Sequence, residues 1–192
     1  MRILLVTGNE GKFREVQAAF GKRGHEVVWK RFPYPEVQTA SLDEVVTEGL
    51  SWLRTKMGEG DPFMIDDSGL FITALKDFPG VFSAHALKTL GNAGILKLMA
   101  GVEDRRARFE ARIGIWMAGT GPRTFPGRID GSIGLEPRGR GGFGFDPIFI
   151  PEGDTRTFAE ISTEEKNAFS HRGRAVAAVL EYLDKEPGNN GQ

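Results

Sequence analysis

Apolar residues recur along the chain in two patterns that alternate with each other. Apolar runs of strand length occupy residues 2–7 and 25–32. Between and beyond these runs, apolar residues return every three or four positions, as one face of an amphipathic helix requires. The longest such segment runs from Leu42 to Met57, with apolar residues at positions 42, 45, 46, 50, 53 and 57. We therefore predict alternating strands and helices through this part of the chain.

The second half of the chain begins with longer apolar runs. Residues 106–118 and 123–136 read as two long strands separated by turn residues, and we predict that they pair in antiparallel fashion. A short helix is expected over residues 162–169, where Ser162 and Glu165 form a capping-box pattern, and a last helix over 175–183. Alternating strands and helices followed by an antiparallel pair predict an α/β fold class, with a mixed sheet and two lobes around a central cleft.

No repeat, low-complexity segment or linker divides the 192 residues. We expect residues 1–185 to form a single domain of two lobes. Residues 186–192, EPGNNGQ, are expected to be a flexible C-terminal tail.

The composition is ordinary for a folded protein, with 40% apolar and 27% charged residues. The net charge of −1 argues against a nucleic-acid partner. The chain has no cysteine, which excludes a disulfide, a thiolate zinc site and a cysteine nucleophile. The apolar run at the start is too short for a signal peptide or a membrane span, so we expect a cytoplasmic protein with no membrane partner.

Residues 7–12, TGNEGK, have the features of a phosphate-binding turn. A strand that leads through a glycine turn into a helix presents free backbone N–H groups and the positive end of the helix dipole. Lys12 adds a full positive charge. The segment is not a Walker A loop, because the pattern GxxxxGK[ST] is absent. The alternative is a simple turn between strand and helix.

Two short apolar runs within residues 62–75 meet at the sequence DDSG, which begins at Asp66. The adjacent carboxylates of Asp66 and Asp67, beside the hydroxyl of Ser68, can hold a hard divalent cation and polarise a water molecule. Glu36, in the extended loop PYPEVQ, is a further candidate oxygen ligand, and oxygen ligands favour Mg²⁺ over zinc. The alternative is that both aspartates cap a turn.

Two further segments concentrate unusual residues. In GGFGFDPIF, residues 141–149, the glycines and the proline predict a shaped loop that leads into a short strand. In KNAFSHRGRA, cations gather near the start of a helix, where they are unfavourable for the helix dipole and require an anion or a base. The basic residues of this segment are Lys166, His171, Arg172 and Arg174. The alternatives are a tight turn with core aromatics and a solvated basic surface.

These four motifs, in this order and over nearly the whole chain, closely resemble those of the inosine triphosphate pyrophosphatase family. The family is also called the Ham1 or non-canonical purine NTP pyrophosphatase family. The segments YPEVQ and RTFAEISTEEKN resemble its archaeal and eukaryotic-type members. The resemblance implies a hydrolase that cuts ITP, dITP and XTP to the monophosphate and pyrophosphate and so removes deaminated purines from the nucleotide pool. It also implies an elongated fold, a homodimer, and an active site in the cleft between the lobes.

The resemblance further implies roles for single residues. Asp67 would be the catalytic proton acceptor, Ser68 would contact the substrate, and Glu36 and Asp67 would hold Mg²⁺. The phosphates would be held by Thr7, Gly8, Asn9, Glu10, Gly11 and Lys12. The nucleotide, mostly its base, would be surrounded by Phe143, Gly144, Phe145, Asp146, Lys166, His171 and Arg172.

Selection among bases requires more than stacking on Phe143, because every base has a face on which a ring can stack. Hypoxanthine carries a carbonyl at position 6 where adenine carries a donor. We expect Arg172 or His171 to donate to that carbonyl, which would disfavour adenine by up to about 10⁴-fold.

In the expected reaction, water attacks the α phosphorus while Mg²⁺ and Lys12 neutralise charge on the phosphates. A carboxylate that binds a metal is a weaker base, so a base role for Asp66 stays open beside that of Asp67.

Three other functions compete with this interpretation. One is a related pyrophosphatase of the Maf type, and another is an inactive nucleotide sensor. The third is an RNA-binding module that uses residues 138–145, RGRGGFGF. One feature departs from the family pattern. Many bacterial members carry a helix lysine that binds phosphate, and this chain has no obvious equivalent, although Arg54 and Lys56 are candidates. Separately, His25 is expected to be exposed.

Overall fold

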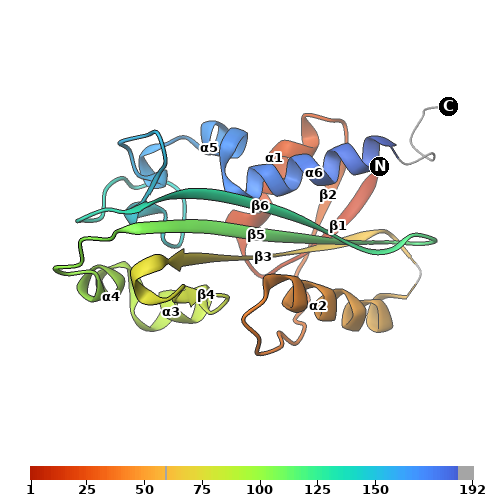
Figure 1. The fold of residues 1–192 in the computed structure, drawn as a ribbon. Helices are drawn as coiled ribbons and strands as arrows, with labels where there is room; N and C mark the ends of the chain where they lie inside the picture. The colour runs from red at the N-terminus through yellow and green to blue at the C-terminus, as the bar shows by residue number, and fades with distance from the viewer. Residues whose placement is uncertain (59, 186–192) are drawn as a thin grey trace.

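The computed structural model describes residues 1–58 and 60–185, so the tail expected at 186–192 lies outside the described residues. The strands are β1 (Arg2–Val6), β2 (Glu26–Lys30), β3 (Phe63–Ile72), β4 (Pro79–Gly80), β5 (Arg106–Met117), β6 (Gly121–Ile133) and β7 (Phe149–Pro151). They form one seven-stranded sheet in the order β2-β1-β3-β5-β6-β7, with β4 paired to β3 (Figure 1). β1 pairs in parallel with β2 and β3, and the other pairs are antiparallel. The predicted mixed α/β sheet and the antiparallel pair are confirmed.

Helices cover both faces of this sheet (Figure 1). The described helices are α1 (Glu10–Gly21), α2 (Leu42–Met57), α3 (Ser83–Thr89), α4 (Gly91–Leu98), α5 (Thr163–Phe169) and α6 (His171–Lys185). Single 3₁₀ turns are η1 (Thr73–Leu75), η2 (Asp146–Ile148) and η3 (Phe158–Glu160). α1 and α6 pack on one face of the sheet, and α2 packs on the opposite face. None of the helices described is long and apolar enough to cross a membrane.

Local sequence sets where these helices begin. The side chain of Asn9 accepts a hydrogen bond from the backbone N–H of Lys12, which satisfies a free donor in the first turn of α1. Ser41 does the same for α2, whose bounds match the predicted segment. At α5 only half of the predicted capping box forms: Ser162 accepts from the Glu165 N–H, but the Glu165 carboxylate binds Arg156 instead.

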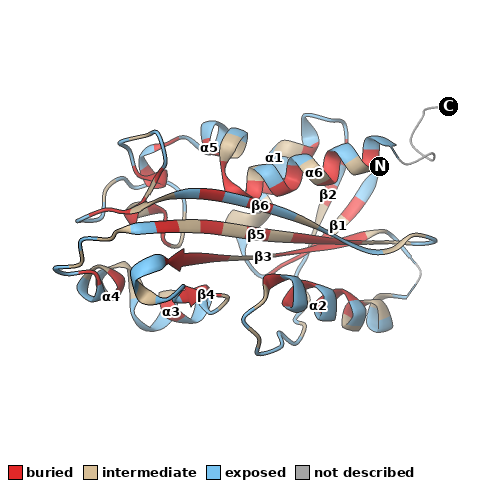
Figure 2. Cartoon of the chain, in the orientation of Figure 1, coloured by how far each residue is buried: buried red, intermediate tan, exposed pale blue. Residues whose placement is uncertain are grey.

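Buried residues alternate with more exposed ones along much of β5, and β3 is buried along most of its length (Figure 2). On β5, Ala111, Ile113 and Ile115 belong to a cluster shared with α1 and α6. On the same strand, Ala107 and Phe109 belong to another cluster, which includes residues of α3, α4 and the η2 and η3 turns. A third cluster lies beneath α2. The long strands therefore join packed regions at the two ends of the sheet, as expected for a two-lobed fold.

Two sequence-based expectations are wrong. The apolar runs on either side of Asp66 belong to one continuous strand, β3, because every residue from Phe63 to Ile72 is paired with β5. His25 is buried rather than exposed, because its ring packs edge-on against Phe20 at the end of α1.

The start of α6 lies directly against bare backbone of β6. A Cβ atom at Gly127 would clash with the backbone carbonyl of His171 and would lie 2.6 Å from the backbone nitrogen of Ala175. Gly127→Ala should therefore lower the free energy of unfolding by about 1–3 kcal/mol, measured by urea denaturation. Gly21→Ala is the control, because nothing lies within 4 Å of the added atom. A similar stability for the two variants would contradict this account.

Candidate active site

A cleft opens where β1 ends and β3 continues. β1 pairs with β3 only as far as Val6 and Ile65. Residues 66–68 of β3 therefore have β5 on one side and the cleft on the other. The cavity in this cleft has a volume of about 270 Å³. The predicted site residues that line it are Thr7, Gly8, Asn9, Lys12, Glu36, Asp67, Ser68, Phe143, Gly144, Phe145, Asp146, Lys166, His171 and Arg172.

The turn after β1 is held by its own polar side chains. The hydroxyl of Thr7 accepts a hydrogen bond from the backbone N–H of Asn9 at 3.1 Å. The ammonium group of Lys12 reaches from α1 across to β3, where it donates to the backbone carbonyl of Asp66 at 2.8 Å. Lys12 thus brings a positive charge to the edge of the cleft, beside the N-terminus of α1.

Two of the predicted phosphate-binding residues do not line the cavity. Glu10 is exposed and forms an ion pair with Arg14 on the surface of α1. Gly11 lies against the aromatic ring of Phe143, and a Cβ atom at this position would come within 2.5 Å of the ring. Gly11 therefore serves the cleft by leaving space for Phe143.

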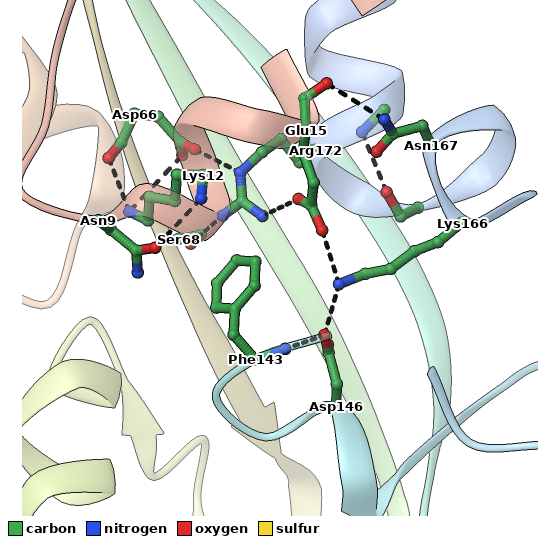
Figure 3. Close-up of polar contacts among 12 residues, drawn as sticks. Asn9, Lys12, Glu15, Asp66, Ser68, Phe143, Asp146, Lys166, Asn167 and Arg172 are labelled. Carbon is green, nitrogen blue, oxygen red and sulfur yellow. Dashed lines mark hydrogen bonds and ion pairs between the residues drawn. The ribbon is translucent and has the colours of Figure 1, made fainter. Parts of the chain in front are cut away.

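A network of buried charges forms the inner wall of the cleft (Figure 3). The Arg172 guanidinium donates to Glu15 at 2.6 Å, to Ser68 at 2.8 Å and, through Nε, to Asp66. The Lys166 ammonium group lies 2.9 Å from the second oxygen of Glu15 and 2.6 Å from Asp146. Glu15 thus bridges the two cations, and the network joins α1, β3, η2, α5 and α6.

This network supplies the anions that the basic cluster requires. Lys166 and Arg172 are each only 2% exposed, so they would be very costly to bury without partners. Together with Lys12 they face an equal number of carboxylates, those of Glu15, Asp66 and Asp146. The wall is therefore close to neutral. Arg174, the remaining cation of this segment, is exposed and donates to a backbone carbonyl of β6.

The protonation of these carboxylates follows from their partners. Burial alone would raise the pKa of Asp66, but the charges of Arg172 and Lys12 outweigh it and hold that pKa below its usual value. The pKa of Glu15 is lowered in the same way, because Arg172 and Lys166 outweigh its burial. For Asp146 burial outweighs the charge of Lys166, and the pKa is raised.

Asp67 has a different environment from its neighbour. Successive side chains of a strand point to opposite faces, so Asp66 faces Arg172 whereas Asp67 faces Tyr34 and Glu36. Burial raises the pKa of Asp67 to about 6, with further contributions from the charges of Asp66 and Glu36, and against the charge of Lys12. The Tyr34 pKa is also raised, by burial and by the same carboxylates. Unlike the neutral inner wall, this side of the cleft carries surplus negative charge.

Asp67 and Glu36 are the residues best placed to hold a cation. Within residues 1–58 and 60–185, no group of three or more His, Cys, Asp or Glu side chains could hold a metal ion by itself. Mg²⁺ does not require such a group, since it commonly binds one or two carboxylates together with water and substrate phosphates. The oxygen ligands and the raised pKa of Asp67 therefore fit Mg²⁺.

The other end of the cleft has an aromatic wall. Phe143 follows Gly142, whose φ of 67° is a conformation that glycine adopts readily. The backbone N–H of Phe143 donates to the Asp146 carboxylate at 2.8 Å. The Lys166 ammonium and the Arg172 guanidinium lie 5.0 and 5.5 Å from the centre of the Phe143 ring. The loop therefore places an aromatic face beside two cations, an arrangement that suits a flat, polar ring.

His171 is a neutral member of this wall. Its imidazole stacks on the Phe109 ring, with the ring centres 4.6 Å apart. Burial lowers its pKa well below the usual value, and the charges of Arg172 and Lys166 add to the effect. Its Nδ1 atom is buried without a hydrogen-bond partner. A neutral imidazole can donate from one nitrogen and accept at the other, so it can contact either kind of group.

Several residues of the cleft were not identified from the sequence as site residues. Glu15 is the most important, and its only signal is its position three residues after Lys12, on the same face of α1. Tyr34 and Phe109 also line the cavity. Further lining residues come from α3 and the turn before it: Val81, Ser83, Ala84 and Leu87. His85, on the same helix, is exposed.

The fold and the cleft together define an α/β protein whose cleft suits a nucleotide, with a turn suited to phosphate, an acidic position and an aromatic pocket. The comparison with protein families gives the particular identity: the chain belongs to the Ham1 family, whose model matches residues 3–182.

Relatives with curated names span the same length. A dITP/XTP pyrophosphatase from Pyrococcus horikoshii is 52% identical over 95% of this chain and 97% of its own. Another, from Thermococcus kodakarensis, is 51% identical with the same coverage. Among solved structures, a HAM1 protein from Coxiella burnetii is 32% identical, with a TM-score of 0.82 over 97% of this chain and 100% of that one. The Staphylococcus aureus Ham1 protein is 26% identical, with a TM-score of 0.80 over 96% and 98% of the two chains.

Asp67→Asn should make the metal-free protein more stable at pH 8. The pKa of Asp67 is about 6 in the folded protein and near 3.8 in the unfolded chain. The folded protein therefore holds this proton more tightly, and stability falls as pH rises from about 4 through 6. The substitution removes that penalty, so the free energy of unfolding should rise by about 1–3 kcal/mol at pH 8 and change little at pH 4.

Urea denaturation with EDTA at the two pH values checks this prediction. Asp130→Asn serves as the control, because Asp130 is exposed, and it should change stability by less than about 0.5 kcal/mol at either pH. An equal effect of Asp67→Asn at pH 4 and pH 8 would show that charge burial is not the cause.

Glu15→Gln should strongly destabilise the protein. It leaves Lys166 and Arg172 buried without their shared carboxylate. Removing one partner of a buried ion pair costs about 3–5 kcal/mol, which would appear as a lower urea midpoint. Glu10→Gln, on the exposed face of the same helix, should cost less than about 0.5 kcal/mol. A loss below 1 kcal/mol for Glu15→Gln would mean that the network tolerates a missing charge.

Proposed function

We propose that this protein hydrolyses the non-canonical purine nucleotides ITP, dITP and XTP to the monophosphate and pyrophosphate. The observation that supports this most directly is that one cleft combines a phosphate-binding turn, a carboxylate of raised pKa and an aromatic pocket lined by donors. Relatives that are 40–52% identical over nearly the whole chain are named dITP/XTP pyrophosphatases. Removal of deaminated purines from the nucleotide pool would be the biological role.

The geometry favours Asp67 over Asp66 as the proton acceptor. Asp66 is bound by Arg172 and its pKa is lowered, so it is a weak base. Asp67 faces the open cleft, and burial raises its pKa to about 6 when no cation is bound, so it is the stronger base of the two, although bound Mg²⁺ would reduce this difference. We propose that Asp67 accepts a proton from the water that attacks the α phosphorus. The bond from the α phosphorus to the bridging oxygen then breaks, and pyrophosphate leaves.

Charge on the departing pyrophosphate would be neutralised by Lys12 and the N-terminus of α1. Lys12 is fixed at the edge of the cleft by its hydrogen bond to the Asp66 carbonyl. In this turn the backbone N–H groups of Thr7 and Asn9 already donate to the Lys30 carbonyl and to the Thr7 hydroxyl, so Gly8 and the first turn of α1 would donate to the phosphates.

Mg²⁺ is the cofactor that we propose, held by Glu36 and Asp67. Both carboxylates lie on the acidic side of the cleft, where burial, together with the charges of Asp66 and Glu36, raises the pKa of Asp67 despite the charge of Lys12. When bound, Mg²⁺ would supply positive charge to the phosphate oxygens.

Base selection is assigned to Arg172 and His171. Arginine carries five N–H donors. Three donor atoms of Arg172 already bind Asp66, Glu15 and Ser68, so its plane is fixed while N–H groups remain for a ligand. These would meet the carbonyl at position 6 of hypoxanthine or xanthine. Against adenine they would meet another donor, which leaves buried groups without partners.

The RNA-binding alternative is disfavoured by the loop at residues 138–145. Its glycines and Arg140 are exposed or half-buried, but Phe145 is buried and Phe143 packs on Gly11. Neither ring is displayed on an open surface, as stacking on single-stranded RNA would require. The family match likewise favours the Ham1 family over the Maf type.

A homodimer and a cytoplasmic location are also proposed, as the family resemblance implies. Phe78 and Phe82 are 38% and 50% exposed and lie beside a groove with Arg108 and Asp77. Apolar side chains flanked by both signs of charge suit contact with a second copy. The molecular mass of the protein in solution tests the homodimer.

Hydrolysis of ITP, XTP, dITP, GTP, ATP and dTTP tests the proposed function. We expect pyrophosphate from the first three, little from the others, and loss of activity with EDTA or with Asp67→Asn. Chromatography separates pyrophosphate from single phosphate. Release of single phosphate, or no release from any of the six, would refute the proposal, and activity that survives EDTA would refute the metal requirement.

A further inference from the structure

Three side chains form a stack beside the phosphate-binding turn. The rings of Phe13 and Trp29 are nearly parallel, with their centres 5.0 Å apart and an angle of 12° between them. On Trp29 lies the guanidinium of Arg31, 4.0 Å from the ring centre. Phe13 directly follows Lys12 on α1, whereas Trp29 and Arg31 belong to β2 and the residue after it.

This stack is attached to the turn by hydrogen bonds. The indole N–H of Trp29 donates to the backbone carbonyl of Thr7 at 2.8 Å. The backbone N–H of Thr7 donates to the carbonyl of Lys30 at 3.2 Å. β1 and β2 are parallel, and Val6 pairs with Lys30. Arg31 therefore leaves the sheet one strand away from Thr7, at the same edge from which the turn emerges.

Arg31 has no anion of its own within the described part of the chain. Its side chain is exposed, and no hydrogen bond or ion pair joins its guanidinium to another described residue. By contrast, Arg172 and Lys166 are bound to carboxylates. Stacking uses the flat face of a guanidinium and leaves the N–H groups at its edge free. Arg31 is thus a cation held in place by Trp29, with N–H groups available to bind an anion.

The order of the strands gives the direction in which a nucleotide would extend. The base pocket lies toward β5 and β6, where Phe109 and His171 stack. Asp67 and Ser68 lie on β3, the turn with Lys12 follows β1, and Arg31 follows β2. A ligand with its base at the first position and its phosphates at the turn would point its last phosphate toward β2. Tyr34 and Glu36, a few residues after Arg31, already line the cavity.

We propose that Arg31, held by Trp29, binds the terminal phosphate of the nucleoside triphosphate. This inference rests on the proposed function, and it gives the cleft a means to distinguish triphosphates from diphosphates. Two N–H groups of the guanidinium edge would bind non-bridging oxygens of the last phosphate, and they would keep hold of it in the pyrophosphate product.

Arg31→Gln tests this proposal, with Lys30→Gln as the matched control. Lys30 is the preceding residue of the same strand and carries the same charge, but its side chain points to the opposite face of the sheet. We expect Arg31→Gln to lower kcat/KM for ITP by about 10- to 100-fold and to weaken inhibition by pyrophosphate equally. The inhibition constant of IDP, which lacks the terminal phosphate, should stay within about twofold. Lys30→Gln should leave all three values near those of the unaltered protein.

Two results would overturn the proposal. Equal losses of kcat/KM for Arg31→Gln and Lys30→Gln would show that only the overall positive charge of this region matters. If Arg31→Gln weakened the binding of ITP and of IDP equally, the substitution would be disturbing the turn as a whole. If the unaltered protein does not release pyrophosphate from ITP, the proposed function fails instead. Arg31 is then tested directly by the binding of pyrophosphate to the unaltered protein and to Arg31→Gln, measured by calorimetry, and equal affinities would overturn its role.

Discussion

The cleft depends on the bridging of two buried cations by Glu15. Arg172 and Lys166 come from neighbouring helices at the end of the chain, whereas Glu15 comes from the first helix. Neither cation could stay buried alone, and each also binds a second carboxylate, on β3 or at η2. Correct charge pairing therefore requires that segments from the beginning, middle and end of the chain meet at one point. The same pairing fixes the direction in which the remaining donors face.

Two adjacent aspartates differ in chemistry because a strand alternates its side chains. Asp66 points to the cationic wall and stays ionised, so it acts as part of the structure. Asp67 points to Tyr34 and Glu36, where its charge is unfavourable until something positive arrives. The protein thus places an unfavourable negative charge at the position where we propose that catalysis occurs. The neighbouring network has balanced charges, so the unfavourable charge is limited to Asp67.

The sequence predicted the elements with strong periodicity but not the contacts between distant ones. α2 and the antiparallel pair β5 and β6 follow from apolar spacing alone, and the four motifs located most of the cleft. The continuity of β3 was missed because acids in the middle of a strand resemble a turn until their partners are known. Glu15 was missed because a glutamate on a helix is usually exposed, and only Arg172 and Lys166, far along the chain, make its burial favourable. Likewise, the roles of Gly11 and the α3 residues depend on what faces them across the cleft.

The contact between Gly11 and Phe143 has a consequence for the shape of any ligand. One belongs to the turn and helix at the phosphate end, the other to the loop at the base end, and they touch without an intervening side chain. Packed atoms of this kind compress very little, so the spacing between the two ends is fixed by direct contact. The cleft therefore selects ligands by their length as well as by their charge. A molecule fits only if the distance from its ring to its first phosphate matches that spacing, whatever groups it carries.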